Sequence, residues 1–385
     1  MRLSLVVAAA VCAALTSAAH AAAPADPLAA TAAYESVGLP AAWDVETGAP
    51  NVVVAVMDSG IDPNHPDLAG ALVAGRNFVD DNADTSDPFG HGTAVAGIVG
   101  ARANNGIGAA GVCWNCRLMP LRVLRPEGYA LKATMARAVD YAVDHGAGVI
   151  NVSLYGETRN GFLHDAIRRA REAGVLVVGA AGNEGWRVEE YPAAFPDVIS
   201  VGATDDGGGL AGFSNRGAWV KVAAPACLPT TQVGGGFGAG CGTSGSTPVV
   251  AGILALLRAH APLASAQQLE DALERTAKPV AGIRYGRVDA FAALQALGRP
   301  GLRVQPAIEG FAGVGRALRA YTGVWSGSGA SFEYRWIRGS GTVVGRDGTY
   351  TLRRADRRFR LRVSVTARVG TSVSSATSTQ TDRVR

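Results

Sequence analysis

Predominantly apolar runs alternate with segments of helical periodicity over residues 50–298. The runs predict strands buried on both faces, because a half-exposed strand would alternate apolar with polar residues. Such strands are predicted at Val52–Val56, Leu118–Val123, Val149–Leu154, Val175–Gly179, Val198–Val201 and Val220–Ala223. Helices are predicted at Gly92–Ala103, Leu131–His145, Phe162–Ala173, Val249–Ala261, Ala266–Arg275 and Asp289–Leu297. This alternation indicates an α/β fold with a parallel sheet covered by helices on both faces.

The periodicity changes after the segment Gly298-Arg299-Pro300-Gly301. Apolar residues then occupy every second position, at Phe332, Tyr334 and Trp336, and again at Phe359, Leu361, Val363 and Val365. A period of two predicts antiparallel strands with one buried face. We therefore expect a small all-β domain over residues 300–385, with Trp336 in its core.

Three polar residues lie where predicted elements begin or end. Asp58 follows the run from Val52 to Met57, His91 begins a helical segment of small residues, and Ser244 precedes the apolar run from Val249. A serine at the first turn of a helix lies beside unpaired backbone N–H groups that can hold an oxyanion. Pro248 is compatible with that first turn. Taken singly, each residue also fits a structural role, as a turn aspartate, a structural histidine or a helix cap.

The three residues together predict nucleophilic chemistry. A nucleophilic serine needs a base, and the base needs an orienting carboxylate. The chain order Asp, His, Ser is one of the orders in which this triad occurs. We expect Ser244 to be the nucleophile, His91 the base and Asp58 its orienting carboxylate.

The segments around these residues resemble the signatures of the subtilisin-like serine peptidases, or subtilases. The matching segments are Val54–Ile61, Gly90-His91-Gly92-Thr93, Ala180-Ala181-Gly182-Asn183, and Gly242-Thr243-Ser244 with Pro248. The resemblance covers roughly residues 26–298. It implies a three-layer subtilisin-like fold and peptide-bond hydrolysis through an acyl-enzyme, with Asn183 as an oxyanion donor. Where the family usually has Met-Ala-Ala, this chain has Gly245-Ser246-Thr247, so we expect a slightly looser turn and an intact nucleophile.

The same resemblance implies a substrate pocket. Ser153 and Leu154 line the substrate backbone, and Gly182 forms another wall of the P1 pocket. Tyr155 stands where a glycine is usual, which narrows the pocket rim. Glu190 aligns with the pocket floor, where a carboxylate favours Arg or Lys at P1. The alternative is that Glu190 turns to solvent.

A calcium site is also implied by the resemblance. Asp67 and Asn105 match its side-chain ligands, and Asp26 completes it from the N-terminal segment. Calcium takes six to eight oxygens, many from the backbone, so the carbonyls of Ala103, Ile107 and Ala109 are further candidates. Simple turn chemistry at the asparagine is the alternative. No organic cofactor is expected.

The N-terminus has the pattern of a secretory signal peptide. Arg2 is followed by an apolar segment up to Leu15 and by the small-residue site Ala19-His20-Ala21. The segment is shorter than a membrane anchor requires. We expect removal of residues 1–21 and secretion to the medium, the periplasm or the cell envelope. The short distance from there to Asp58 leaves no evident inhibitory pro-domain.

Export also determines how many cysteines remain and how we expect them to pair. Cys12 lies in the signal peptide, and the four others allow three pairings. Cys113-Trp114-Asn115-Cys116 is a C-x-x-C sequence, for which redox and zinc roles are alternatives. Exported proteins favour disulfides. We expect the pairs Cys113–Cys116 and Cys227–Cys241, the second as a clamp on the loop before Ser244.

Charge is distributed unevenly between the two regions. The chain has 385 residues, 48% of them apolar, and a formal charge of +4, which excludes a disordered chain. After residue 299, 15 arginines oppose five acidic residues, so this region carries +10 and the rest carries −6. The arginines fit a solvated face; the alternative is attachment to an anionic polymer or envelope surface.

The C-terminal region resembles a bacterial immunoglobulin-like module by Gly323-Val324-Trp325-Ser326-Gly327, Tyr334-Arg335-Trp336 and Val363-Ser364-Val365-Thr366-Ala367. We expect a signal peptide (1–21), a peptidase domain (22–298) and an immunoglobulin-like β-sandwich (300–385). The predicted function is a secreted, monomeric serine endopeptidase that acts on proteins or peptides and binds no nucleic acid. The alternative is a secreted envelope- or polymer-binding protein with a weakly active peptidase fold.

Overall fold

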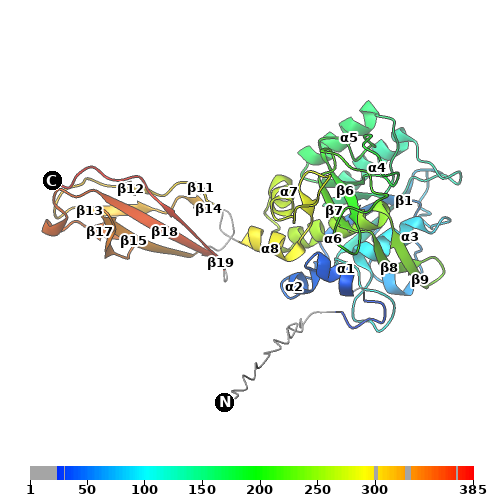
Figure 1. The fold of residues 1–385 in the computed structure, drawn as a ribbon, viewed down its shortest axis with the longest axis horizontal. Helices are drawn as coiled ribbons and strands as arrows, with labels where there is room; N and C mark the ends of the chain where they lie inside the picture. The colour runs from blue at the N-terminus through cyan, green and yellow to red at the C-terminus, as the bar shows by residue number, and fades with distance from the viewer. Residues whose placement is uncertain (1–23, 30, 299–301, 326–330, 370–371) are drawn as a thin grey trace, which may run out of the picture.

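An eight-stranded parallel sheet lies at the centre of the N-terminal part of the chain, in the order β10-β7-β6-β5-β4-β1-β3-β2 (Figure 1). Its strands are β1 (Val53–Asp58), β2 (Arg76–Asn77), β3 (Arg117–Arg122), β4 (Val149–Val152), β5 (Leu176–Ala180), β6 (Val198–Thr204), β7 (Val222–Pro225) and β10 (Gly286–Arg287). All six predicted strands are present. The two additional strands, β2 and β10, have two residues each and are too short for a hydrophobic period.

The computed structural model describes residues 24–29, 31–298, 302–325, 331–369 and 372–385. The predicted signal peptide, 1–21, lies outside these residues. The helices are α1 (Thr31–Ser36), α2 (Leu39–Trp43), α3 (His91–Gly100), α4 (Lys132–Asp144), α5 (Gly161–Glu172), α6 (Thr243–His260), α7 (Ala266–Arg275) and α8 (Ala290–Gly298), with a short 3₁₀ turn, η1 (Pro66–Leu68). Within the described ranges, no helix combines the length and apolar character needed to cross a membrane.

Helices cover both faces of the sheet, as the predominantly apolar runs predicted. In β1, Val54 and Val56 pack into a core with α3 and α6, whereas Ala55 and Met57 pack into a second core with α4 and α5. Figure 1 shows α4 and α5 on the side of the sheet opposite α6. A strand in this position needs apolar residues at every position, because alternate side chains enter different cores.

An antiparallel hairpin, β8 (Cys227–Gln232) with β9 (Gly236–Cys241), lies outside the central sheet. The predicted disulfide Cys227–Cys241 joins its two ends. Thr231 Oγ1 donates to the carbonyl of Thr93 at 2.7 Å, so the hairpin is bonded to α3. The glycine-rich sequence of β9 gave no strand signal, and the hairpin was not predicted.

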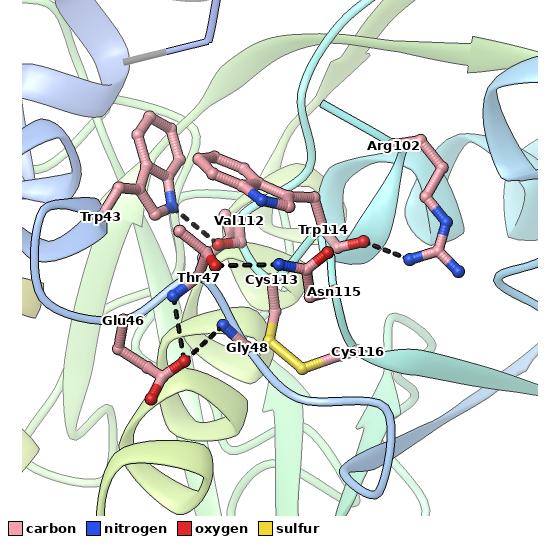
Figure 2. Close-up of a disulfide and its surroundings, with 10 residues drawn as sticks. All are labelled: Trp43, Glu46, Thr47, Gly48, Arg102, Val112, Cys113, Trp114, Asn115 and Cys116. Carbon is pink, nitrogen blue, oxygen red and sulfur yellow. Dashed lines mark hydrogen bonds between the residues drawn. A yellow bond between two sulfur atoms is a disulfide. The ribbon is translucent and has the colours of Figure 1, made fainter. Parts of the chain in front are cut away.

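The second predicted disulfide, Cys113–Cys116, is also present and is buried. Figure 2 shows it beside the segment that follows α2. Thr47 accepts from Asn115 through both its carbonyl and its hydroxyl, at 3.2 and 2.9 Å. The centroids of the Trp43 and Trp114 rings lie 4.7 Å apart. The C-x-x-C segment therefore joins the N-terminal helices to the body of the fold.

The C-terminal region contains antiparallel sheets that fit a small all-β domain, as predicted. One sheet has β12 (Ala307–Glu309), β13 (Ala317–Tyr321) and β17 (Thr349–Thr351); a second has β15 (Ser331–Arg338), β16 (Thr342–Gly345), β18 (Leu361–Val369) and β19 (Ser372–Thr377); β11 (Leu302–Val304) pairs with β14 (Val324–Trp325), and η2 spans Arg354–Asp356. Trp336 is fully buried between the sheets, as predicted, but Phe359 precedes β18 and is 47% exposed. The immunoglobulin-like resemblance and the limits 22–298 and 300–385 stay predictions.

Candidate active site

Asp58 and His91 meet at the carboxyl end of β1. Asp58 Oδ1 lies 2.8 Å from His91 Nδ1 and also accepts the Ser59 backbone N–H at 2.8 Å. The Asp58 side chain is fully buried, whereas the His91 ring, on the first residue of α3, is 37% exposed. A side chain on Gly92 would collide with the carbonyl oxygen of Gly60. Glycine at this position therefore lets the start of α3 approach the end of β1.

The environment of His91 favours its charged form. The Asp58 carboxylate raises the pKa of His91 above its usual range, with a smaller contribution from Asp87, whereas burial acts in the opposite direction. Asp58 Oδ2 is buried and has no hydrogen-bond partner among the described residues. A buried carboxylate with little compensation stabilises an adjacent imidazolium. The pair is therefore suited to holding a proton on the imidazole.

Asp87 is a supporting residue that the sequence analysis missed. Its Oδ1 accepts the N–H groups of Phe89 and Gly90 at 3.0 and 2.8 Å, and its Oδ2 accepts the N–H and hydroxyl of Thr93 at 2.8 and 2.7 Å. Thr93 lies in the first turn of α3, where its N–H has no partner within the helix, whereas Phe89 and Gly90 lie directly before the helix. Asp87 lies four residues before His91, and the N-cap position is Gly90, so the usual N-cap signal does not identify Asp87.

Ser244 lies at the second position of α6 and is bonded reciprocally to Ser153. Its hydroxyl donates to the Ser153 carbonyl at 3.2 Å, and the Ser153 hydroxyl donates to the Ser244 carbonyl at 3.1 Å. Ser153 directly follows β4, and Val152 of β4 pairs with Met57 of β1. Asp58, at the end of β1, and Ser153, directly after the adjacent β4, therefore lie at the same edge of the sheet, and the bonds to Ser153 hold Ser244 of α6 there. The Ser244 hydroxyl points to Ser153 in this structure rather than to His91.

The prediction that Pro248 lies in the first helical turn is wrong. The helix α6 begins at Thr243, six residues before the expected Val249, and Pro248 lies inside it. A proline has no N–H, so the carbonyl four residues earlier loses its helical partner. That carbonyl belongs to Ser244, and the Ser153 hydroxyl satisfies it instead.

Gly245 takes part in close packing, and the slightly looser turn stays a prediction. A Cβ at this position would lie 2.5 Å from the Gly240 oxygen of β9 and 3.0 Å from that of Ala226. The hairpin thus fills the space that a side chain would need. The next residue, Ser246, donates to the carbonyls of Ala224 and Pro225 at 3.0 and 2.9 Å.

The Asn183 side chain is oriented by its bonds. Its Oδ1 accepts the Thr243 N–H at 2.9 Å and the Thr243 hydroxyl at 3.1 Å, so its nitrogen must point the other way. That nitrogen donates to the Tyr155 hydroxyl at 3.2 Å. Within the described residues, the N–H of Ser244 has no acceptor. Two N–H donors therefore lie at the first turn of α6.

The family model described as the subtilase family matches residues 49–304. The chain belongs to the subtilase family. A thermophilic serine proteinase from Bacillus sp. strain AK1 is 40% identical over 258 residues, which cover 66% of this chain and 64% of that protein. Thermitase from Thermoactinomyces vulgaris is 37% identical over 279 residues, 71% of this chain and 99% of that protein.

A solved structure described as proteases from Pseudoalteromonas arctica PAMC 21717 is also similar to this subtilase. It has a TM-score of 0.65 and 32% sequence identity, and covers 71% of this chain and 99% of that one. The subtilisin-like α/β fold class is thereby confirmed. Family membership and these relatives support a serine endopeptidase.

The two predicted pocket segments of the subtilase lie side by side. Gly156 and Tyr191 exchange backbone hydrogen bonds of 3.0 and 2.9 Å. This pairing brings the segment Ser153-Leu154-Tyr155 next to the segment that begins at Glu190. Gly182 donates its N–H to Thr243 Oγ1 at 3.2 Å, so it lies beside the start of α6.

Glu190 does not turn to solvent. The residue is 2% exposed, and its Oε2 is buried without a hydrogen-bond partner in the described part of the chain. Burial raises the pKa of Glu190, and the charges of Glu184 and Glu157 raise it further, whereas Lys132 lowers it. The site therefore combines a buried carboxylate with a surplus of negative charge.

The three predicted calcium ligands of the subtilase are brought together. Asp26 accepts the N–H groups of Asn104, Asn105 and Gly106 at 2.7, 3.1 and 3.1 Å, and Asn105 Nδ2 donates to Asp67 Oδ1 at 2.7 Å. Burial raises the pKa of Asp67, and the charge of Asp26 raises it further. The described residues hold no metal-binding group of three or more His, Cys, Asp or Glu. The Asn105 oxygen accepts the Ile107 N–H at 3.0 Å, so it would have to turn toward Asp67 to join the two carboxylates in a site that suits the hard cation Ca²⁺.

Proposed function

We propose that this chain is a serine endopeptidase with Asp58, His91 and Ser244 as its triad. The observation that carries this assignment is the 2.8 Å contact between Asp58 Oδ1 and His91 Nδ1, at the sheet edge that also carries Ser244. A hydrogen bond from Nδ1 to a carboxylate leaves Nε2 free to accept a proton.

In the proposed mechanism, the Ser244 hydroxyl turns from the Ser153 carbonyl and attacks the scissile carbonyl. His91 Nε2 takes the hydroxyl proton and then delivers it to the leaving amine, while Asp58 stabilises the imidazolium. The acyl-enzyme is then hydrolysed by water. The oxyanion accepts hydrogen bonds from the Ser244 N–H and from Asn183 Nδ2. Loss of one such donor typically costs about 2.7–4 kcal/mol, a value that comes from a subtilisin.

A fluorophosphonate probe tests the nucleophile, because it labels activated serines covalently. The full chain should be labelled and Ser244→Ala should not. Ser246→Ala is the matched control, since Ser246 lies on the same helix but bonds only to backbone carbonyls. Unchanged labelling of folded Ser244→Ala would overturn the assignment.

We further propose that substrates bind along Ser153-Leu154-Tyr155 and Gly182, with Glu190 beneath the P1 side chain. A basic P1 residue would supply a hydrogen-bonded counter-charge to Glu190, whose Oε2 has no hydrogen-bond partner among the described residues. Peptides that differ only at P1 test this. Arg and Lys should be preferred over Leu and Phe, and Glu190→Gln should reduce that preference. Equal rates for basic and apolar P1 would contradict it.

We propose a structural calcium site held by Asp26, Asp67 and Asn105, with backbone carbonyls nearby. The cation would offset the repulsion between the two carboxylates and fasten the N-terminal segment to the loop that carries Asn105. Differential scanning calorimetry of Ser244→Ala with calcium and with EDTA tests it. An unchanged melting temperature would contradict it, and Asp67→Asn should abolish any shift.

We also propose that the chain is secreted and cleaved after residue 21. Its domains would span residues 22–298 and 300–385, and it would be a monomer. A relative described as a minor extracellular protease of Bacillus subtilis, 33% identical over 243 residues, supports export. N-terminal mass spectrometry of the exported chain and light scattering of the purified protein test these points together.

A second candidate function concerns the end of the C-terminal region where the chain terminates (Figure 1). Backbone bonds join Arg358 to Val384, Leu352 to Arg316, and Arg385 to Ala312, so this end gathers several arginines. The exposed ones are Arg316, Arg353, Arg354, Arg357, Arg358, Arg383 and Arg385. Asp356, in the same stretch, is buried and bonded to Arg338 and Tyr350.

This arginine end would bind an anionic polymer or envelope surface through charge-assisted contacts. Retention of the full chain on dextran sulfate should fall steeply with salt. Replacement of Arg354 and Arg357 by Gln should lower it, whereas replacement of the distant Arg275 should not. Retention that does not depend on these arginines would contradict the proposal.

A further inference from the structure

Tyr155, Asn183 and Glu184 form a closed ring of hydrogen bonds beside the first turn of α6. The Tyr155 hydroxyl donates to Glu184 Oε1 at 3.0 Å and accepts from Asn183 Nδ2 at 3.2 Å. The backbone N–H of Asn183 donates to Glu184 Oε2 at 2.8 Å, which closes the ring. Each group in the ring therefore has a defined donor or acceptor role.

The amide group of Asn183 is held from both ends. Thr243 binds its oxygen through two donors, and Tyr155 binds one hydrogen of its nitrogen. A primary amide has two N–H groups, so one N–H remains for a substrate oxyanion. A donor that is fixed before the reaction costs no reorganisation in the transition state.

The phenol can serve as an acceptor because its own proton is committed elsewhere. Burial raises the pKa of Tyr155, and the hydrogen bond and charge of Glu184 raise it further, so the hydroxyl keeps its proton and directs it to Glu184. The lone pairs of the phenol oxygen then face Asn183.

Glu184 is itself fixed by the buried Asn215. Asn215 Nδ2 donates to Glu184 Oε2 at 3.1 Å, and Asn215 Oδ1 accepts the N–H of Glu184 at 3.2 Å. The same oxygen accepts the Trp186 N–H at 2.8 Å. Glu184 is exposed, but these bonds anchor it to the fully buried Asn215.

We infer that Tyr155 is a positioning residue for the oxyanion donor Asn183, held in place by Glu184. The inference rests on the oxyanion role of Asn183 under the proposed function. The glycine usual at position 155 has no side chain, so it could supply no such acceptor. Tyr155 therefore has a second role besides narrowing the pocket rim.

Steady-state kinetics of the full chain on one peptide substrate test the inference through Tyr155→Phe, which keeps the ring and removes the hydroxyl. We expect kcat to fall about 2- to 10-fold, as for the loss of one neutral hydrogen bond, with KM little changed. Inhibition by a peptide aldehyde, which forms an oxyanion, should weaken by the same factor. Glu184→Gln, which keeps an acceptor for the phenol, should lose less activity than Glu184→Ala.

A double-mutant cycle with Asn183→Ala separates the possible causes. Tyr155→Phe should have no further effect on kcat in the Asn183→Ala background. An equal fall in that background, or a change confined to KM, would overturn the inference. A rise in kcat for Tyr155→Phe would also overturn it and would show that the phenol obstructs the oxyanion position. If Asn183→Ala alone leaves kcat unchanged, the oxyanion role in the proposed function fails instead.

Discussion

The Ser153 hydroxyl donates to the backbone carbonyl of Ser244. In a regular helix this carbonyl would accept the N–H of residue 248, but Pro248 has no N–H. The bond from Ser153 joins the end of β4 to the first turn of α6. Ser153→Ala leaves a part-buried carbonyl without this donor, which should lower the free energy of unfolding by about 1 kcal/mol. Urea denaturation in the Ser244→Ala background, which prevents self-digestion, measures the loss. Ser153→Thr retains a hydroxyl and is the control; an equal loss in both variants would contradict the argument.

The pH dependence of hydrolysis should follow His91. Only neutral imidazole accepts the Ser244 proton, and Asp58 raises the pKa of His91. We therefore expect kcat/KM to rise with pH and to level off above the ordinary histidine range. Asp58→Asn should move this rise in kcat/KM to lower pH and reduce kcat by about 10⁴-fold. Asp382→Asn, at a side chain that is 93% exposed, should change neither quantity.

Glu274 on α7 should make the stability depend on pH. Burial raises the pKa of Glu274 to about 7, and the charge of Glu270 adds to the shift. Between the ordinary carboxyl pKa and about pH 7, the folded chain retains a proton that the unfolded chain has lost. The free energy of unfolding therefore falls as pH rises through this window and stays lower above it.

Replacing Glu274 with Gln removes this ionisation. In the Ser244→Ala background, Glu274→Gln should raise the urea midpoint at about pH 8. It should leave the midpoint nearly unchanged at about pH 4, where the Glu274 carboxyl is protonated in both the folded and the unfolded chain. Glu309→Gln, at an exposed site, is the control. A gain that is equal at both pH values would count against the buried Glu274 carboxyl as its source.

The two disulfides should differ in their effect on catalysis. Loss of Cys227–Cys241 opens a hairpin that contacts α3 through Thr231 and packs on Gly245 of α6. Replacing both cysteines with Ser should cost about 3 kcal/mol, as for a loop of about 15 residues, and should lower kcat. The Cys113–Cys116 pair closes a shorter loop, so its loss should cost less and leave kcat nearly unchanged. Equal kcat values for the two double variants would contradict this distinction.

The sequence predicted the elements whose burial pattern is local. Each strand of four or more residues in the central sheet gave a predominantly apolar run, although Asn151 interrupts β4 and Ser200 interrupts β6. Asp58 was recognisable because it ends such a run, and His91 because it begins a helical segment. The start of α6 was not predictable in this way, since it depends on Asn183 binding Thr243 across 60 positions of the chain. The hairpin β8–β9 is held by contacts with α3 and α6, which no short-range pattern records.

The pocket and metal residues show the same limit. The resemblance identified Glu190, Asp26, Asp67 and Asn105, but the burial of Glu190 comes from the pairing of Gly156 with Tyr191. Asp87 and Asn215 act mainly through hydrogen bonds with backbone groups, and neither had a sequence signal. Phe359 followed the alternation correctly but lies before β18, so periodicity alone did not establish its burial.

The paired serines also have a mechanical consequence. Because Ser153 and Ser244 are bonded in both directions, a displacement of the segment after β4 carries the turn of Ser244 with it. A peptide bound along that segment would therefore move together with Ser244 Oγ. Thermal fluctuation of this edge would then change the position of substrate and nucleophile together while preserving the gap between them.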